Sequence, residues 1–187
     1  MAVIVGIASV LLAIGATSYF RYRANTAVNT GAETIEALLV RGKEEAKTSG
    51  FALAGTLRQN GVTTAAPEGR FGADRAVAVR VRKRYRAGGP VQMVATKDLS
   101  LAAPVEVEVV GLGVIDIDTD ASQEGVFFEV LVKDGASATL LATVPIDVNG
   151  ELILAGAAGN GAIRLHSGTY SRAIEVTRRG AIQPDRR

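Results

Sequence analysis

The sequence predicts an α+β protein in which one long N-terminal helix packs on an antiparallel β domain. Three observations lead to this fold class. Residues 1–20 contain no charged side chain, and Arg21 and Arg23 follow directly. Over residues 18–50 the apolar positions narrow to one stripe at helical spacing. After residue 75 they recur at every second residue, which is the period of a half-buried strand.

The composition limits both the size of the fold and the chemistry open to it. The chain has 187 residues, enough for one globular domain and an appendage. Its formal net charge of +2 is far from the imbalance of a dedicated nucleic-acid binder. The absence of cysteine excludes disulfides, thiolate nucleophiles and cysteine-ligated metal sites. The single histidine, His166, argues against a histidine-based triad, and no pattern favours an enzyme.

The first half of the helix, residues 1–20, predicts a membrane span. Twenty apolar residues measure about 30 Å as a helix, which is the thickness of the hydrocarbon layer. A cleaved secretory signal is the alternative and would give a mature start near Ser18, but residues 1–6 lack the basic stretch of such signals. Basic residues on the C-terminal side favour a cytoplasmic β domain, and a basic leader upstream, later removed, would reverse that orientation.

The second half, residues 18–50, predicts an amphipathic helix that ends at Gly50. Gly31 and Gly42 each weaken a helix by about 1 kcal/mol relative to Ala, and they permit close approach of a neighbouring helix. An unbroken helix over both halves is too long for one small domain to cover. The apolar stripe of this half consists of Val28, Ala32, Ile35, Leu38, Leu39 and Ala46.

The remaining chain predicts a connecting loop at 51–75, an antiparallel β domain at 76–183 and a basic tail at 184–187. Turn signals rich in Gly, Asn and Pro separate the strand candidates, and Asn149-Gly150 is typical of a two-residue hairpin. The turn signals lie at residues 87–90, 133–135, 149–150 and 159–161. The strand candidates are residues 77–84, 91–96, 105–109, 113–118, 126–132, 138–144, 151–154, 162–166 and 172–177.

A run of carboxylates has spacing that resembles a calcium loop. The EF-hand pattern requires Gly at its sixth position and Glu at its twelfth, and Ala121 and Phe127 stand there instead. A different loop-type calcium site, or an acidic strand end facing solvent, remains as an interpretation, and no other cofactor is indicated. The carboxylates concerned are Asp116, Asp118, Asp120 and Glu124.

Four arginines at alternate positions should share one face of a strand, about 6.6 Å apart. Such a row suits the phosphates of a nucleic acid, a partner protein or a solvated face, and it could also pair with Glu106 and Glu108 across a sheet. No aromatic ladder accompanies it, so stacking on single strands is not indicated. The row consists of Arg80, Arg82, Arg84 and Arg86, and Arg178 and Arg179 add basic charge near the C-terminus. A glycine-rich run at 156–161 predicts a long hairpin turn, because no helix pattern follows it.

Two stretches carry a family resemblance. Residues 18–46 are similar to the helix of type IV pilin-like proteins, in particular H-type minor pseudopilins of type II secretion and FimT-type minor pilins. Those helices typically end in a Leu-x-x-Ala-Arg-Ser-Glu-Ala-like segment, where Leu39 to Ala46 stands here. Residues 161–180 resemble the closing hairpin of that family, which ends in a glycine after a Ser/Thr-rich strand. The two stretches cover the first quarter and the last seventh of the chain.

The chain also departs from the family pattern. The family opens with Phe-Thr-Leu-Ile-Glu after a basic leader, and Val5 stands in place of that Glu if Met1 is the first mature residue. Matching residues 18–46 without gaps instead places Met1 near the sixth mature position, with the Glu and the leader upstream. DNA-receptor pilins of the FimT type carry a Gly-Arg-x-Arg-like motif, where this chain has Gly180-Ala-Ile-Gln183.

The resemblance implies a structural subunit of a type IV pilus-like or type II secretion pseudopilus filament. It implies a single-pass inner-membrane protein with a periplasmic C-terminal domain, which becomes part of a periplasmic or extracellular filament. Implied partners are other pilin-like subunits, an inner-membrane assembly platform and a prepilin peptidase. Two alternatives remain, a DNA-binding minor pilin for DNA uptake and a generic membrane-anchored periplasmic binding module. The helix–helix assembly contacts would involve Gly6, Ala8, Ala13, Gly15, Ile35, Leu38 and Leu39.

Overall fold

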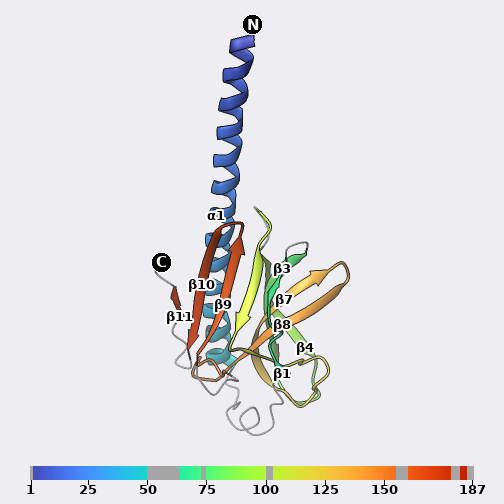
Figure 1. Ribbon diagram of the computed structural model, residues 1–187. Helices are drawn as coiled ribbons and strands as arrows, with labels where there is room; N and C mark the ends of the chain where they lie inside the picture. Colours follow the sequence, from blue (N-terminus) through green and yellow to red (C-terminus); the bar gives the residue numbers. More distant parts are fainter. Residues whose placement is uncertain are drawn as a thin grey trace.

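A computed structural model describes residues 2–49, 64–72, 75–99, 103–154, 160–177 and 182–184; the side chains of residues 2–11, 13, 64–65 and 182–184 lie outside the description. The fold is α+β, with one long helix and antiparallel sheets (Figure 1). Helix α1 (Ala2–Ser49) runs without a break for 48 residues. Its first half projects from the β domain and its second half lies along the sheets (Figure 1).

The strands form two larger sheets and one short pair, with every pairing antiparallel. The five-stranded sheet has the order β11 (Ile182–Pro184), β10 (Tyr170–Thr177), β9 (Asn160–Ser167), β5 (Glu106–Val110) and β2 (Arg70–Phe71). The four-stranded sheet has the order β4 (Val91–Asp98), β3 (Ala76–Arg84), β7 (Gly125–Asp134) and β8 (Ser137–Ile146). The short pair joins β1 (Thr64–Ala65) to β6 (Gly113–Val114).

The second half of α1 shares one hydrophobic core with both larger sheets. All six residues of the apolar stripe are buried, as their helical spacing predicts. They meet alternate residues of the strands, such as Val79 on β3, Val130 on β7 and Leu165 on β9. A second, smaller cluster lies on the other face of the four-stranded sheet, where Ile117 packs on Phe127. The four-stranded sheet is therefore covered on both faces around β7.

The two glycines of this helix half accommodate strands of the same chain. A Cβ atom at Gly31 would lie 3.0 Å from Leu165 Cδ1, and one at Gly42 would lie 2.7 Å from Ile146 Cδ1. The expectation that these glycines admit a neighbouring helix is therefore wrong for this chain. Their missing side chains let β9 and β8 approach the helix axis instead.

Several predicted elements differ in the structure. Residues 64–65 and 70–71, within the expected connecting loop, form β1 and β2 because each pairs with a strand of the β domain. The strand expected at 113–118 ends at Val114, and residues 115–124 form turns. Asn160 and Gly161 belong to β9 rather than to a turn, since both pair with β10. The candidate at 151–154 contributes one bridge, between Leu152 and Ile146.

The tight turns agree better with their sequence signals. Gly135 takes a φ of +59° between β7 and β8, and Gly88 takes +71° between β3 and β4. Gly150 also takes a left-handed φ, +77°, but its turn is longer than the predicted two-residue hairpin: the N–H of Gly150 donates to the carbonyl oxygen of Asp147, and the N–H of Asp147 donates to the carbonyl oxygen of Glu151, both at 2.9 Å. Glycine tolerates this left-handed conformation where other residues are strained.

Candidate functional site: the projecting helix and the arginine row

The projecting half of α1 exposes apolar side chains over most of its described length. Among the described side chains of α1, the first buried one is that of Ala27, and roughly 25 helix residues, or about 37 Å of helix, precede it. Leu12, Ile14 and Phe20 are 75%, 60% and 65% exposed. Exposed apolar surface of this extent marks a site of contact with a membrane or another protein.

The predicted assembly residues divide between the two halves. Ile35, Leu38 and Leu39 are buried against the sheets of their own chain, so the expectation that they contact other subunits is wrong. Gly15 lies in the projecting half, and a Cβ atom there would meet nothing within 4 Å. The remaining three, Gly6, Ala8 and Ala13, belong to α1, but their side chains lie outside the described residues.

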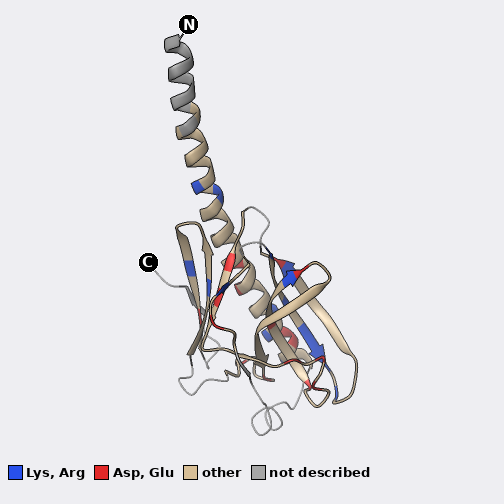
Figure 2. Ribbon diagram, turned by 45° about the vertical axis from the view of Figure 1, so that its right-hand side comes forward, with Lys and Arg blue, Asp and Glu red and all other residues tan. Residues whose placement is uncertain are grey.

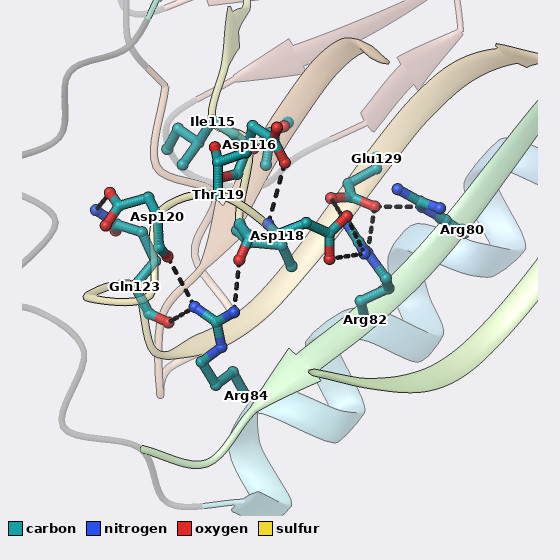
Figure 3. Close-up of polar contacts among 12 residues, drawn as sticks. Arg80, Arg82, Arg84, Ile115, Asp116, Asp118, Thr119, Asp120, Gln123 and Glu129 are labelled. Carbon is teal, nitrogen blue, oxygen red and sulfur yellow. Dashed lines mark hydrogen bonds and ion pairs between the residues drawn. The ribbon is translucent and has the colours of Figure 1, made fainter. Parts of the chain in front are cut away.

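Three arginines of the row, Arg80, Arg82 and Arg84, lie on β3 and bind acceptors inside the protein. Arg82 is buried, and its guanidinium donates to Glu129 on β7 through Nη2–Oε1 at 2.6 Å and Nε–Oε2 at 2.7 Å. The same guanidinium donates to both carboxylate oxygens of Asp118, at 2.7 and 2.8 Å. Arg80 Nε donates to Glu129 Oε2 at 2.5 Å. Figure 3 shows these side chains converging between β3, β7 and the turns that follow β6.

Arg84 holds those turns to the sheet through backbone oxygens. Its side chain is buried, with Nη1 donating to the carbonyl oxygens of Asp120 at 2.7 Å and Gln123 at 3.2 Å. Nη2 donates to the carbonyl oxygen of Ile117 at 2.5 Å. One guanidinium thus donates to three carbonyl oxygens. Without it, each carbonyl oxygen that is shielded from water would be left without a hydrogen bond, which lowers the stability of the fold.

Arg80, Arg82 and Arg84 are therefore neither a solvated face nor a row free for phosphates. Only Arg86, beyond the end of β3, is exposed among the four, and Arg178 and Arg179 lie outside the described residues. The predicted partners Glu106 and Glu108 are on β5 of the other sheet, where they meet Arg70 at 4.0 Å and Arg164 at 3.5 Å. His166 also lies beside Glu108, at 3.4 Å.

The four carboxylates considered for calcium each accept hydrogen bonds within the chain. Asp118 faces Arg82, and Asp116 Oδ1 accepts from the backbone N–H of Asp118 at 3.0 Å. Asp120 accepts from Ser122 Oγ and Gln123 Nε2, both at 2.6 Å, and Glu124 Oε2 accepts from the N–H of Ala87 at 3.2 Å. Within the part of the chain that the structure describes, no three Asp, Glu or His side chains are grouped so that they could hold a metal ion.

The charges in this cluster are stabilised by their neighbours. Burial by itself lowers the pKa of Arg82, but the hydrogen bonds to Glu129 and Asp118 outweigh that effect and raise it. The hydrogen bonds from Ser122 and Gln123 lower the pKa of Asp120. Both groups are held in their charged forms, so this cluster positions the turns at 115–124 rather than offering a free acid or base.

The residue that sequence reasoning missed is Glu129. Its side chain is fully buried, and it accepts hydrogen bonds from both Arg80 and Arg82. A signal was present, because Glu129 is the only charged residue within the apolar strand candidate 126–132. A carboxylate that a strand pattern places in the core requires a buried cation. Arg80 and Arg82, from the alternating arginines of β3, supply that cation.

An ion pair also joins the C-terminal end of α1 to β3. Lys83 Nζ donates to Glu45 Oε1 at 2.7 Å, and the Lys83 ammonium lies 4.7 Å from the centre of the Tyr85 ring. The hydrogen bond to Glu45 raises the pKa of Lys83, and the same bond lowers the pKa of Glu45. Arg172 on β10 lies 3.8 Å from Glu36, so both sheets make polar contacts with the helix in addition to the core.

Among the residues that the structure describes, no helix is sufficiently long and apolar to cross a membrane. That description does not extend to the side chains of residues 2–11 and 13, on which much of the predicted span at 1–20 falls. In comparisons with known proteins, no family model, no curated protein and no solved structure matches the chain.

Proposed function

We propose that this chain is a structural subunit of a type IV pilus-like or type II secretion pseudopilus filament, held in the inner membrane before assembly. The observation that carries the proposal is the division of α1 into two halves. The second half is buried in its own β domain, whereas the first half projects with Leu12, Ile14 and Phe20 exposed. The resemblance of residues 18–46 and 161–180 to pilin-like proteins supports the same reading.

The division assigns a different task to each half. Before assembly, the apolar residues 1–20 would lie in the bilayer, with the β domain on the periplasmic side. In the filament, the projecting halves of neighbouring subunits would pack together, and small residues such as Gly15 would allow close approach. Leaving the lipid is then tolerable, because the filament interior is as apolar as the bilayer.

The burial of Ile35, Leu38 and Leu39 narrows the proposed assembly surface. These residues cannot contact another subunit without leaving the core of their own domain. Of the helix positions predicted for assembly, this leaves those of the projecting half, and we expect the contacts between subunits to lie there, before Ala27.

N-terminal mass spectrometry of the protein from its native membrane, read with the upstream coding sequence, tests this proposal. A start directly after a basic leader that ends in Gly, with a methylated amine, is expected of a pilin-like subunit. An unprocessed Met1 would instead indicate an ordinary membrane anchor for a periplasmic binding domain. A start near Ser18 would indicate a secreted β domain. Either of the last two results would overturn the filament role.

A further inference from the structure

We propose that Tyr19, Phe20, Arg21, Tyr22 and Arg23 form a collar that sits in the headgroup layer of the bilayer and selects anionic phospholipids. The inference rests on the proposed membrane anchoring and adds the depth of the chain in the bilayer and the lipid class that it prefers. The collar lies in α1 between the exposed apolar stretch and the β domain.

The collar presents aromatic and basic side chains on all sides of the helix. Five consecutive positions step round an α-helix by about 100° each, so together they complete the circle. Tyr19, Phe20 and Tyr22 are 57%, 65% and 69% exposed, and Arg21 is exposed as well. A helix that docks on a protein needs one apolar face, whereas an environment that surrounds the helix favours such a ring.

The residue types of the collar match the bilayer interface. Tyrosine and other aromatic rings concentrate at the level of the headgroups, with the apolar ring inward and the polar edge in water. Arginine binds phosphate oxygens through two parallel N–H groups, and its aliphatic stem lies along apolar surface. Here the guanidinium of Arg23 lies 5.7 Å from the centre of the Tyr19 ring, and the Tyr19 and Phe20 rings meet edge to face at 6.1 Å.

The position of the collar along the helix also places it at the level of the headgroups. The stretch from Ala2 to Ser18 measures about 26 Å as a helix, close to the hydrocarbon thickness. Arg21 precedes the first buried helix residue, Ala27, by six positions, or about 9 Å. Because α1 is unbroken over this interval, the collar would hold the β domain at a fixed, short height above the lipid phosphates. Figure 2 shows basic residues on the helix where it leaves the β domain.

The arginines supply the preference for anionic lipid. A basic side chain near an anionic leaflet gains about 1 kcal/mol, which corresponds to about a fivefold preference per arginine. Arg21 and Arg23 together should therefore enrich anionic lipid around the helix severalfold over a zwitterionic lipid. The preference should weaken as salt concentration rises, because the Debye length shortens.

The full chain, reconstituted in phosphatidylcholine vesicles, offers a direct test because it contains no tryptophan. Phe20→Trp places a single fluorescent reporter in the collar, and Leu12→Trp places one in the apolar stretch. Phospholipids brominated at shallow or deep acyl positions then report depth, and brominated phosphatidylglycerol against brominated phosphatidylcholine reports lipid preference. The Phe20→Trp emission should be quenched most by shallow bromines, and severalfold more effectively by phosphatidylglycerol.

Two charge variants identify the source of the preference. Arg21→Gln/Arg23→Gln in the Phe20→Trp chain should abolish the preference for phosphatidylglycerol, and Arg21→Lys/Arg23→Lys should keep most of it. Arg41→Gln/Arg86→Gln removes the same charge from two exposed arginines outside the collar and should leave the preference unchanged. Equal quenching by the two lipids in the parent chain, or a preference that survives the glutamine pair, would overturn the proposal.

The Leu12→Trp reporter separates this proposal from the proposed function. Deep quenching at Leu12 with no lipid preference at Phe20 would reject the collar and leave the membrane anchor intact. Absence of deep quenching at Leu12 would reject membrane anchoring and the collar with it.

Discussion

Arg82 and Glu129 form a buried ion pair between β3 and β7, in which Nη2 and Nε of the arginine donate to the two carboxylate oxygens at 2.6 and 2.7 Å. The two side chains are 7% and 0% exposed. Asp118 binds the other edge of the same guanidinium, so this pair links the sheet to the turns at 115–124. Arg82 thus holds to the sheet a segment whose Ile115 and Ile117 also pack on Phe127.

Replacement of Glu129 by alanine should strongly destabilise the β domain. The change leaves Arg82 buried with half its partners, and breaking such a pair typically costs about 3–5 kcal/mol. Urea denaturation should show that loss of unfolding free energy. Asp98→Ala is the control, because Asp98 pairs with Lys133 at the surface and should cost less than about 1 kcal/mol. Equal losses in the two variants would contradict the structural role of Glu129.

Arg84→Met should loosen the turns at 115–124. Three carbonyl oxygens lose their donor, and each unsatisfied buried acceptor costs about 1–3 kcal/mol, less wherever water enters. Amide hydrogen exchange at residues 115–124 should accelerate by at least tenfold. Arg86→Met, two residues further on at an exposed position, should leave exchange in the segment unchanged. Unaltered exchange in Arg84→Met would show that the turns hold without this guanidinium.

Gly42→Leu should destabilise the packing of the helix on the sheets, because a Cβ atom at this position would already crowd Ile146. Overpacking of this kind costs about 1–3 kcal/mol, more than leucine gains over glycine in helix propensity. Gly15→Leu is the matched control in the same helix, where nothing lies within 4 Å. Thermal unfolding should show a lower midpoint for Gly42→Leu alone; a midpoint equal to that of Gly15→Leu would refute the close contact.

The Glu45–Lys83 pair should contribute to stability over a defined pH range. The pKa of Glu45 lies below its ordinary value of 4.5, so its contribution is present above that value and is lost as the pH falls through the folded pKa. The pKa of Lys83 lies above 10.5, so its contribution is present below that value and is lost as the pH rises through the folded pKa.

Glu45→Gln tests this dependence. At pH 7 the substitution should lower the unfolding free energy by less than about 1 kcal/mol, because the pair is partly solvated. At pH 3 the difference from the parent chain should shrink as Glu45 becomes protonated. Glu44→Gln removes the same charge from an exposed neighbour and should show no such change between the two pH values. A Glu45→Gln effect that grows at pH 3 would contradict the assigned direction.

The periodicity of the sequence predicted which residues of a single helix or strand share its buried face. The spacing of the stripe from Val28 to Ala46 identifies the buried face of α1, and the alternation of valines on β3 identifies its core face. Both follow from the fixed turn of a helix or strand, which places residues on a face without reference to the rest of the chain. The glycine turns at Gly88 and Gly135 were predictable for the same reason.

Pairings over long sequence distances were not predictable in this way. The alternation placed Arg80, Arg82 and Arg84 on one face, but it could not say that β7 and not β5 lies beside them. Arg80 and Arg82 therefore pair with Glu129, and Arg82 also with Asp118, instead of with Glu106 and Glu108. Arg84 binds backbone carbonyl oxygens. The two-residue strands β1 and β2 also escaped prediction, since so short a segment has no measurable period and depends on its neighbour.

We expect the projecting half of α1, and not its buried half, to join one subunit to the next. Single cysteines in this cysteine-free chain test it most directly, at Leu12 and Ile14 in the projecting half and at Val40, exposed beside the β domain. In native membranes or filaments, oxidation should link chains through Leu12→Cys and Ile14→Cys and leave Val40→Cys monomeric. Absence of cross-links at Leu12 and Ile14, or equal cross-linking at Val40, would contradict the account.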